Sequence, residues 1–578
     1  MNLFKLRPKK YTFSVFVVRA LFLLFAGAII IQLVKLQVFQ HHELMDKAQR
    51  WRQPLHSFNF RGEIVDRKGI RLAADKTLYD IYAHPSYFEN TPKKMAAKLA
   101  PLLKVPESVL LEKLAKTDVS TITLAKDIDR DTELQICKLK LKGLDPVKKS
   151  ERVYPQGNLA SHILGYVNFD ANLFAGVEST AKDKLQATPK VKPIEYDGRG
   201  GVIYDTSTDP ATATQPLTGK KITLTIDSEI QHIAETELAK MVTKSHAKRG
   251  TVIVMNPKNG EILGFAVLPT YNPNQYNKVS QQVVKNWVLS DVYPPGSTFK
   301  ILTIACGLES GAINEYEKIL DTGKIKIDGW PIQNYDYGKH GAPGIIDLKY
   351  LFVHSSNVAS LKVALKIPKT TYYNLLKKFG MGHTTGIDLP GESRGIIPPP
   401  SEWSRSTQAT MGFGYSLAST PIQVAAAVAA IANGGIWTTP HVIKYTPEEA
   451  TKRIKTRRVI SEITAQKLTH ILAQSIEASD AKAGKIPNFN VAGKTGTSRK
   501  PNPNGPGYIP NSVFTSFVGY FPVKDPQVLM MVVVDDPKGA EVWGSTIAGP
   551  IFNSIATEVC RILNLEPDAP GKYTKKGE

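Results

Sequence analysis

The stretch Val292–Gly311, VYPPGSTFKILTIACGLESG, decides how the rest of the chain is interpreted. Pro-Pro-Gly is typical of a turn, and the apolar residues behind it recur at helical spacing, so a turn followed by a helix is expected. Ser297 stands where a helix-capping serine would stand. Lys300 follows on the same face of the first turn, where an amine can take the proton of a hydroxyl. Ser297 is therefore either a cap or a nucleophile.

The composition describes a folded, basic protein. The chain has 578 residues, too many for one compact domain, so two or three are expected. A formal net charge of +21 would suit nucleic acid, a membrane surface or an acidic polymer as a partner. The sequence has no zinc-finger spacing, RNA-binding aromatic motif or phosphate-binding glycine loop. Nucleic acid is therefore disfavoured as a partner.

The cysteines and histidines give no sign of a metal centre or a cofactor. Cys137, Cys306 and Cys560 lie far apart in the sequence and predict neither a disulfide framework nor a metal site. Cys306 falls in the apolar stretch after Ser297, where a small buried side chain is expected. His41-His42-Glu43 is no ligand set, because adjacent helical residues point in different directions. We expect no metal and no cofactor.

The N-terminal segment predicts a membrane anchor. Residues 1–12 are basic, and an apolar run from Phe13 to about Val34 follows, which exceeds the ~20 residues that a membrane span needs. Arg19 lies near one end of the run and can snorkel to the headgroups. No small-x-small cleavage site ends the run, so we expect an uncleaved anchor over residues 13–38, with a cleaved signal peptide as the alternative. The basic flank predicts a cytoplasmic N-terminus, with everything after about residue 40 outside.

Two larger regions follow the anchor. The first, residues 40–215, mixes strand-like segments with helical stretches near 92–117 and 131–141. Its last part, 205–219, is rich in Thr, Pro and Ala and is expected to connect the two regions.

The second region, residues 220–567, predicts an α+β domain. Two apolar strands flank a turn at 256–260, and a helix-rich middle extends from about 275 to 485. Three strand-like runs then follow, FNVAGKTGTS, VFTSFVGYFP and QVLMMVVVDD, before a closing amphipathic helix. Two early and three late strands would form one five-stranded antiparallel sheet with helices on its faces. Residues 568–578 are expected to be a flexible tail.

Three short motifs settle the interpretation of Ser297. Ser-x-x-Lys is frequent in this chain, but only at Ser297 does it follow a turn, precede an apolar helix and stand ahead of two other motifs. These are Ser355-Ser356-Asn357, a Ser-x-Asn motif, and Lys-Thr-Gly at Lys494. The ordered trio is typical of serine enzymes that form acyl intermediates.

On these motifs the chain resembles a class B penicillin-binding protein, the monofunctional peptidoglycan transpeptidase of bacteria. Seven ordered segments carry the resemblance over most of residues 61–552: RGEIVDRKGIRLA, ERVYPQGNLASHILGYV, YPPGSTFK, TTGIDLPGE, FGYSLASTPIQVAAAVAAIANGG, VAGKTGTS and SFVGYFP. The resemblance implies an elongated mixed pedestal or dimerisation domain at 40–215. It also implies a penicillin-binding transpeptidase domain at 220–567.

Acyl transfer needs an activated nucleophile, donors for the oxyanion and a cationic grip on the substrate. Ser297 at a helix N-terminus lies beside the positive end of the helix dipole. Lys300 can act as a base only if it is neutral, which a buried site and a second cation, Lys494, would favour. The resemblance implies that Ser355 lies on the proton path to the leaving amine. It also implies that Asn357 hydrogen-bonds the substrate and Lys300.

The Lys-Thr-Gly segment implies a substrate-binding strand. By resemblance, Lys494 and the hydroxyls of Thr495 and Thr497 would hold the terminal carboxylate of D-alanine or of a β-lactam. Gly496 would let the extended donor peptide approach the strand closely. The backbone N–H groups of Ser297 and Thr497 would form the oxyanion hole.

The resemblance also implies a setting in the cell. The substrates would be peptidoglycan stem peptides, with β-lactams as covalent inhibitors. The partners would be a membrane glycan polymerase and other cell-division proteins. The chain would cross the bacterial cytoplasmic membrane once and hold its catalytic domain on the extracytoplasmic side. Its length and pedestal spacing look more like the septal division enzyme than the elongation enzyme, which stays open as the alternative.

Three other classes are disfavoured. A bifunctional class A enzyme would carry a Glu-Asp dipeptide in its glycosyltransferase module, and this sequence has none. A β-lactamase would need neither the anchor nor the first region. A penicillin-binding sensor or scaffold usually has several membrane spans, whereas this sequence predicts one.

Overall fold

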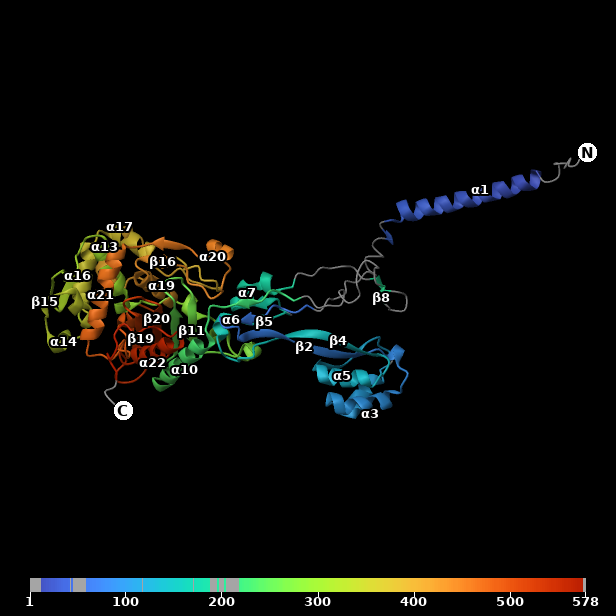
Figure 1. Ribbon diagram of the computed structural model, residues 1–578, viewed down its shortest axis with the longest axis horizontal. Coiled ribbons are helices and arrows are strands. Elements are labelled where there is room, and N and C mark those ends of the chain that lie inside the picture. Colours follow the sequence, from blue (N-terminus) through green and yellow to red (C-terminus); the bar gives the residue numbers. More distant parts are fainter. Residues whose placement is uncertain are drawn as a thin grey trace, which may run out of the picture. The chain divides into compact units, whose positions relative to one another are not determined.

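The computed structural model describes residues 12–41, 43–44, 59–116, 118–169, 171–187, 195–196, 202–203 and 218–574 (Figure 1). The predicted cytoplasmic tail and the predicted connection at 205–219 lie almost entirely outside these ranges. Two compact units divide the chain: residues 1–60 with 187–218, and residues 61–186 with 219–578.

The first unit contains the predicted anchor. Helix α1 (Thr12–Val34) continues as a π-helical turn, η1 (Lys35–Phe39). The segment Phe13–Phe39 has a mean hydropathy of 2.5 and is long and apolar enough to cross a membrane. The unit also holds the short strands β7 (Glu195–Tyr196) and β8 (Val202–Ile203).

The second unit begins with the mixed domain expected from the sequence. Its sheet has the order β3-β2-β1-β9, and β4 also pairs with β2. The strands are β1 (Ile64–Val65), β2 (Arg71–Ala83), β3 (Ile122–Ile128), β4 (Leu144–Val153) and β9 (Ile222–Thr223). The helices α3 (Pro92–Leu103), α4 (Glu107–Leu114) and α5 (Arg130–Lys138) bury their apolar faces against β2 and β3. These helices fall where the helical periodicity placed them.

A buried charge network joins the two pedestal segments that carried the family resemblance. The Glu178 carboxylate accepts hydrogen bonds from Arg61 Nε at 2.5 Å and from Arg152 Nε at 2.6 Å. Arg152 also pairs with Asp75 at 3.0 Å, and all four side chains are almost completely buried. Because each buried charge has a partner, the network fixes the two segments against each other.

The boundary predicted between the regions separates two strands of one sheet. β9 follows the predicted connection, yet it pairs in parallel with β1 from the start of the first region. Between β4 and β9 the chain also forms three short helices and a hairpin: α6 (Ser161–Leu164), α7 (Gly176–Thr180), α8 (Lys182–Leu185), β5 (Val167–Asn168) and β6 (Leu173–Phe174). Pairing between distant segments cannot be seen in a linear pattern.

The predicted five-stranded antiparallel sheet is confirmed, with the order β11-β10-β20-β19-β18. Its strands are β10 (Arg249–Met255), β11 (Ile262–Leu268), β18 (Ala492–Pro501), β19 (Tyr508–Phe521) and β20 (Val528–Asp535). In β20, Met531 and Val533 enter one hydrophobic core, while Met530 and Val532 enter another. Both faces of the sheet are covered, which explains an antiparallel strand that is apolar at nearly every position.

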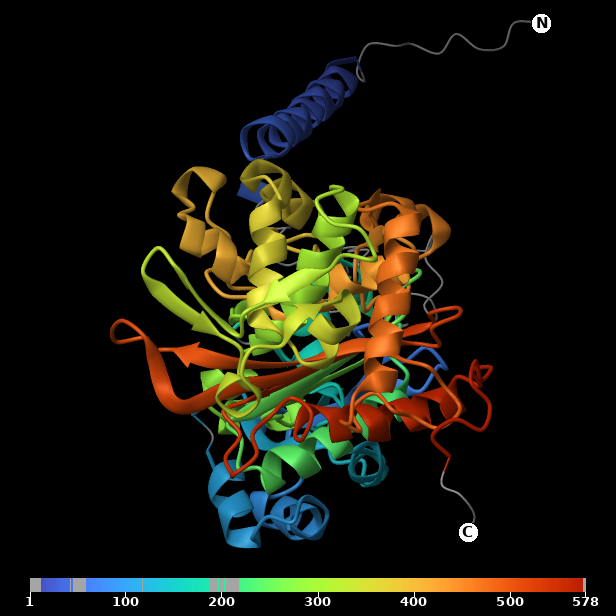
Figure 2. The same cartoon turned by 90° about the vertical axis from the view of Figure 1, so that its left-hand side faces the viewer.

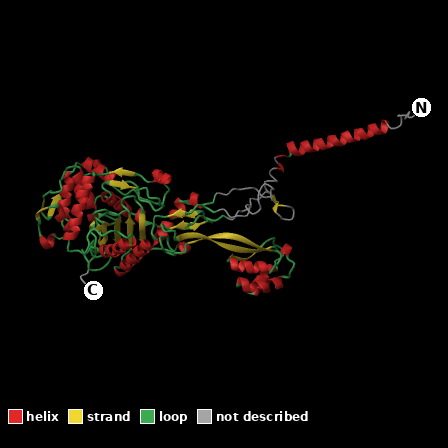
Figure 3. Ribbon diagram, in the orientation of Figure 1, coloured by secondary structure: helices red, strands yellow, loops and turns green. Residues whose placement is uncertain are grey.

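Helices cover each face of this sheet (Figures 2 and 3). One face carries α10 (Ser228–Lys244) and the closing amphipathic helix α22 (Ala548–Ile562). The other carries α13 (Lys300–Glu309), α19 (Pro421–Ala432) and α21 (Glu462–Ala478). The apolar helix α19 is buried throughout, so it is the core helix that its length indicates.

Smaller elements fill the helix-rich middle. The helices are α11 (Gln281–Val284), α12 (Trp287–Ser290), α14 (Tyr337–His340), α15 (Leu348–Val353), α16 (Asn357–Lys366), α17 (Lys369–Lys378), α18 (Arg405–Met411) and α20 (Pro447–Arg453). The strands are β12 (Ile319–Asp321), β13 (Lys324–Ile327), β14 (Trp330–Gln333), β15 (Gly344–Ile346), β16 (Ile436–Thr438) and β17 (Thr456–Arg458). Short 3₁₀ turns are η2 (Pro85–Tyr87), η3 (Pro273–Lys278), η4 (Gly296–Phe299) and η5 (Pro400–Glu402).

The C-terminal segment differs from the flexible tail that the sequence predicted. The Asp568 carboxylate accepts hydrogen bonds from the backbone N–H groups of Asn490, Val523 and Lys524. Lys572 donates to the Asn490 side chain at 2.9 Å. These contacts hold residues 568–572 against the domain, and the last four residues lie outside the described ranges.

Candidate active site

Ser297 lies in the turn η4, directly before helix α13. Pro295 and Phe299 occupy the capping positions of these two elements, and no side chain caps either of them. The interpretation of Ser297 as a helix cap is therefore wrong. Gly296 has φ +61, and a Cβ there would stand 2.8 Å from Ser498 Cβ, so the glycine lets this turn pack directly on strand β18.

A chain of hydrogen bonds joins the first two motifs. Lys300 Nζ donates to the Ser355 backbone carbonyl at 2.5 Å, to Ser355 Oγ at 3.1 Å and to Asn357 Oδ1 at 2.8 Å. Ser355 Oγ in turn donates to Ser297 Oγ at 2.9 Å. The Lys300 amine is thus connected to the Ser297 hydroxyl through the hydroxyl of Ser355, which lies 58 positions from Ser297 in the sequence.

The two lysines of the site are both buried, and neither has a carboxylate partner among the described residues. Lys300 is 0 % exposed and Lys494 is 4 % exposed. Burial and the nearby Lys494 charge lower the pKa of Lys300 well below its ordinary value. Burial lowers the pKa of Lys494 to about 8. Both shifts favour the neutral form of the amine, and at Lys300 the neighbouring Lys494 charge adds to the effect of burial.

The third motif lies on β18, which is an edge strand of the sheet. Lys494 Nζ donates to Thr495 Oγ1 at 3.3 Å, while Thr497 Oγ1 accepts the Gly544 N–H at 3.1 Å. Neither threonine hydroxyl donates a hydrogen bond to another residue that the structure describes. A Cβ on Gly496 would stand 3.0 Å from Thr298 Cγ2 and 2.5 Å from Ser516 Oγ, so any larger residue would require these side chains to shift.

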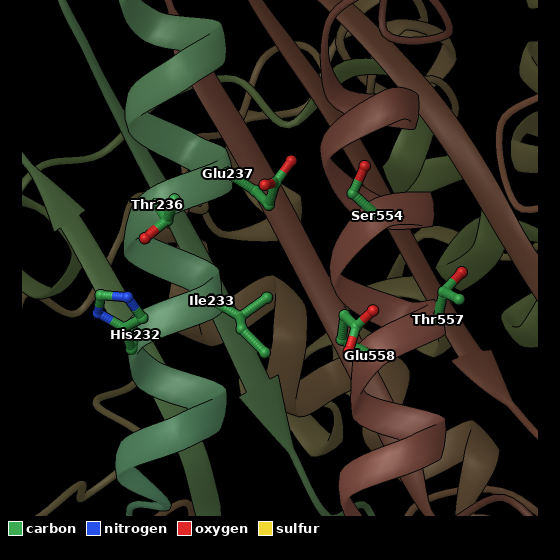
Figure 4. Close-up of a pocket in the computed structure, with 7 residues that line it drawn as sticks. All are labelled: His232, Ile233, Thr236, Glu237, Ser554, Thr557 and Glu558. Atoms are coloured by element: carbon green, nitrogen blue, oxygen red, sulfur yellow. The ribbon is translucent and has the colours of Figure 1, made fainter.

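The structure thus brings all the predicted site residues into one region. Hydrogen bonds link Ser297, Lys300, Ser355 and Asn357. The packing of Gly296 on β18 adds the backbone of Thr497. Within the described part of the chain, no group of three or more His, Cys, Asp and Glu side chains is placed to hold a metal ion. A groove between α10 and α22 (Figure 4) lies on the opposite face of the sheet and shares no residue with this site.

Comparisons with known proteins agree with this geometry. The penicillin-binding protein transpeptidase domain matches residues 250–557, and the penicillin-binding protein dimerisation domain matches residues 59–173. Stage V sporulation protein D of Bacillus subtilis is 32% identical over 95% of this chain and 86% of its own length. The chain belongs to the class B penicillin-binding transpeptidases. Peptidoglycan D,D-transpeptidase FtsI of Escherichia coli is 30% identical over 88% of this chain and 84% of its own length.

A solved penicillin-binding protein structure shows the same fold. Penicillin Binding Protein 2X from Streptococcus thermophilus superposes with a TM-score of 0.73 and 22% identity, over 90% of this chain and 83% of its own.

Sequence reasoning missed the polar layer beneath the second motif of this penicillin-binding transpeptidase. Asp321 is 0 % exposed, and its carboxylate accepts hydrogen bonds from Ser356 Oγ at 2.5 Å and from Asn334 Nδ2 at 2.8 Å. Asn334 Oδ1 accepts the backbone N–H groups of Asn357 and Val358, which begin helix α16. Asp321 therefore positions the residues that hold Lys300. Nothing in the local pattern around Asp321 distinguishes it from a turn residue.

We expect Asp321→Asn to slow β-lactam acylation roughly tenfold and to lower the thermal unfolding midpoint. A hydrogen bond to a buried charged group contributes about 1.5–3 kcal/mol, and an amide cannot accept from all of these donors. Because the Asp321 charge raises the pKa of Lys300, its loss should also move the acid limb of the acylation profile to lower pH. Acylation rates measured across pH test this, with Asp328→Asn on an exposed turn as the matched control. An unmoved acid limb would show that Asp321 is merely structural.

Proposed function

We propose that this chain is a peptidoglycan D,D-transpeptidase that crosslinks stem peptides through an acyl-enzyme on Ser297. The observation that carries the proposal is the hydrogen-bonded series Lys300–Ser355–Ser297. The relatives named D,D-transpeptidases support the reaction class. A serine hydroxyl is a weak nucleophile at its ordinary pKa. In acyl transfer, a neutral amine beside it acts as the base that removes its proton.

In the first step, Ser297 Oγ attacks the carbonyl carbon of the penultimate D-alanine and gives up its proton toward Lys300. The backbone N–H groups of Ser297 and Thr497 stabilise the oxyanion. The C–N bond then breaks, and the proton reaches the departing D-alanine amine through Ser355. In the second step, the amine of another stem peptide attacks the ester, and Ser297 Oγ leaves with a proton returned through the same groups.

The donor peptide would be held by the Lys494 charge and the edge of β18. The ammonium, with the hydroxyls of Thr495 and Thr497, is suited to the terminal carboxylate. Since β18 pairs with only one neighbouring strand, its other edge can pair with an extended peptide. A β-lactam presents a carboxylate and a strained amide to the same groups.

We expect acylation by a carboxylate-bearing β-lactam to fall as pH rises through about 8. Below its pKa of about 8 Lys494 is charged and grips the carboxylate, and above it the charge is lost. Stopped-flow acylation rates between pH 6 and pH 10 measure this alkaline limb, the fall in rate as Lys494 loses its charge. Lys494→Arg, which keeps its charge over this range, should remove the limb, so persistence of the same limb in that variant would contradict the assignment.

The direct test of the activity is turnover of a D-Ala-D-Ala donor peptide with an acceptor amine. The expected products are a crosslinked dimer and free D-alanine in equal amounts. β-Lactam labelling without any crosslinked product, in the presence of its membrane partners, would favour a sensor or scaffold.

The proposed setting is septal wall synthesis, with the catalytic domain outside the membrane and a glycan polymerase as partner. Relatives named FtsI and the apolar segment Phe13–Phe39 support this assignment. Depletion in the source bacterium is expected to give filaments, because septal crosslinking fails while elongation continues. Rounded cells would assign the enzyme to elongation instead.

A further inference from the structure

Four basic side chains come from neighbouring segments outside the transpeptidase motifs. Arg457 Nη2 lies 3.5 Å from the Cβ position of Gly380 and Lys377 Nζ lies 3.1 Å from that of Gly382, while Gln423 joins the His383 and Arg394 segments. Lys377 lies in the last turn of helix α17, His383 and Arg394 lie on the loop that follows it, and Arg457 lies on strand β17. We call these four residues the basic cluster. It does not belong to the site described above and has no part in the proposed reaction.

Specific contacts hold the basic cluster together. The buried Gln423 amide donates to the His383 carbonyl at 2.6 Å and to the Arg394 carbonyl at 2.7 Å, which fixes these two loop segments side by side. Lys377 Nζ donates to the Gly382 carbonyl at 3.2 Å, directly beside His383. The arrangement is therefore built by the fold and does not depend on free lysine side chains.

Arg457 is held just as firmly. Its guanidinium lies 3.7 Å above the centre of the Trp437 ring, and its Nε donates to the Lys378 carbonyl at 2.8 Å. Stacking and this hydrogen bond orient the guanidinium plane and leave its outer N–H groups available.

No carboxylate in the described part of the chain neutralises the basic cluster. Among the described residues, none of its four side chains has a carboxylate oxygen within 4.0 Å. The nearby carboxylates accept hydrogen bonds from backbone N–H groups instead. Asp388 accepts from Val442 and Ile443, and Glu392 accepts from Thr385 and Gly386. Burial and then the surrounding cations lower the pKa of His383, and burial and Arg394 lower the pKa of Lys377. The charges thus act on one another without compensation.

A buried donor without a partner lies at the same place. Trp437 is 3 % exposed, and its indole Nε1 has no hydrogen-bond partner in the structure. A Cβ at Gly380 would stand 3.5 Å from both Trp437 Nε1 and Arg457 Nη2. Gly380 has φ +98 and no side chain, so two N–H donors border the same spot. Leaving a buried donor unsatisfied costs about 1–3 kcal/mol, which a bound acceptor would recover.

We propose that the basic cluster binds a phosphate group, supplied by free phosphate or by an anionic phospholipid headgroup. The oriented guanidinium of Arg457, the amine of Lys377 and the indole N–H suit the oxygens of a tetrahedral anion. A single carboxylate would neutralise only one of the gathered charges. The proposal stands whether or not Ser297 is a nucleophile.

The test is calorimetric titration of the full chain in neutral detergent, at constant ionic strength. Inorganic phosphate, acetate, dihexanoyl phosphatidylglycerol and dihexanoyl phosphatidylcholine are the probes, with both lipids below their micelle concentration. Binding of phosphate supports a free-anion ligand, and tighter binding of phosphatidylglycerol supports a headgroup. Acetate binding as tight as phosphate, or heat that follows ionic strength alone, would overturn the proposal.

Variants separate a built site from general basic charge. The double variant K377Q/R394Q should weaken phosphate binding tenfold or more, whereas K452Q/K455Q, which removes two exposed charges nearby, should change it less than twofold. Equal losses in the two double variants would overturn the proposal. Arg457→Lys keeps the charge but lacks Nη2, and it should still weaken binding. If K377Q/R394Q unfolds, as shown by its thermal midpoint, unchanged binding by Arg457→Lys would overturn the proposal on its own.

Discussion

Ser297→Ala is expected to lose covalent labelling by a fluorescent penicillin completely, while the thermal unfolding midpoint stays within about 1 °C of the parent protein. The hydroxyl is the only group in the proposed reaction that forms a bond to the substrate, so no partial activity should remain. Removal of a helix cap would cost about 0.5–2 kcal/mol. Ser297 caps neither η4 nor α13, so this cost does not arise.

Labelling followed by gel fluorescence and by intact mass provides the measurement. Ser310→Ala, at the other end of the same helix, is the matched control, because among the described residues its hydroxyl bonds only to the Gly307 carbonyl. It should label at the parental rate. An acyl adduct of unchanged mass in Ser297→Ala would place the nucleophile on another residue and would remove the basis of the proposed mechanism.

Lys300→Arg is expected to slow acylation by ~10²–10⁴-fold, the usual contribution of a positioned proton acceptor. A guanidinium keeps its proton at all accessible pH values, so it cannot take the proton of Ser297. Lys300 is fully buried and bonded to Ser355 and Asn357, so the larger head group should also displace the second motif and lower the unfolding midpoint.

Single-turnover acylation kinetics separate these two effects. If Lys300 is the base, the residual rate of Lys300→Arg loses the acid limb of the pH profile, whereas displacement alone lowers the rate and keeps the limb. Lys362→Arg on the neighbouring helix α16 is the control, since its amine donates only to the Leu320 carbonyl at the surface. A Lys300→Arg variant that acylates within threefold of the parent would exclude the lysine as the base.

Much of the fold could be predicted because its signals are local. The turn at 256–260 and the apolar runs of β10 and β11 are read from neighbouring residues, and both strands form as expected. The apolar segment Phe13–Phe39 needs only its length and composition. The tail is the counterexample: Lys572 bonds to Asn490, a contact across 82 positions that no local pattern reveals.

The candidate site divides in the same way. Ser297, Lys300 and Lys494 could be selected from the sequence because the motifs that contain them are short and ordered. Asp321 and Asn334 could not, since they act through contacts 35 and 23 positions away, with Ser356 and Asn357. The stacking of Arg457 on Trp437 could not be predicted either, because it is a contact between two separate segments of the chain.

The sequence by itself determined the type of the strongly periodic elements, the order of the motifs and the chemical groups that they offer, because these depend on periodicity and composition. Only the tertiary structure supplies the burial and the neighbouring charge that lower the pKa of Lys300. The ordinary pKa of a lysine is the same at every position in a sequence, and it changes only when the fold buries Lys300 and places a second ammonium beside it.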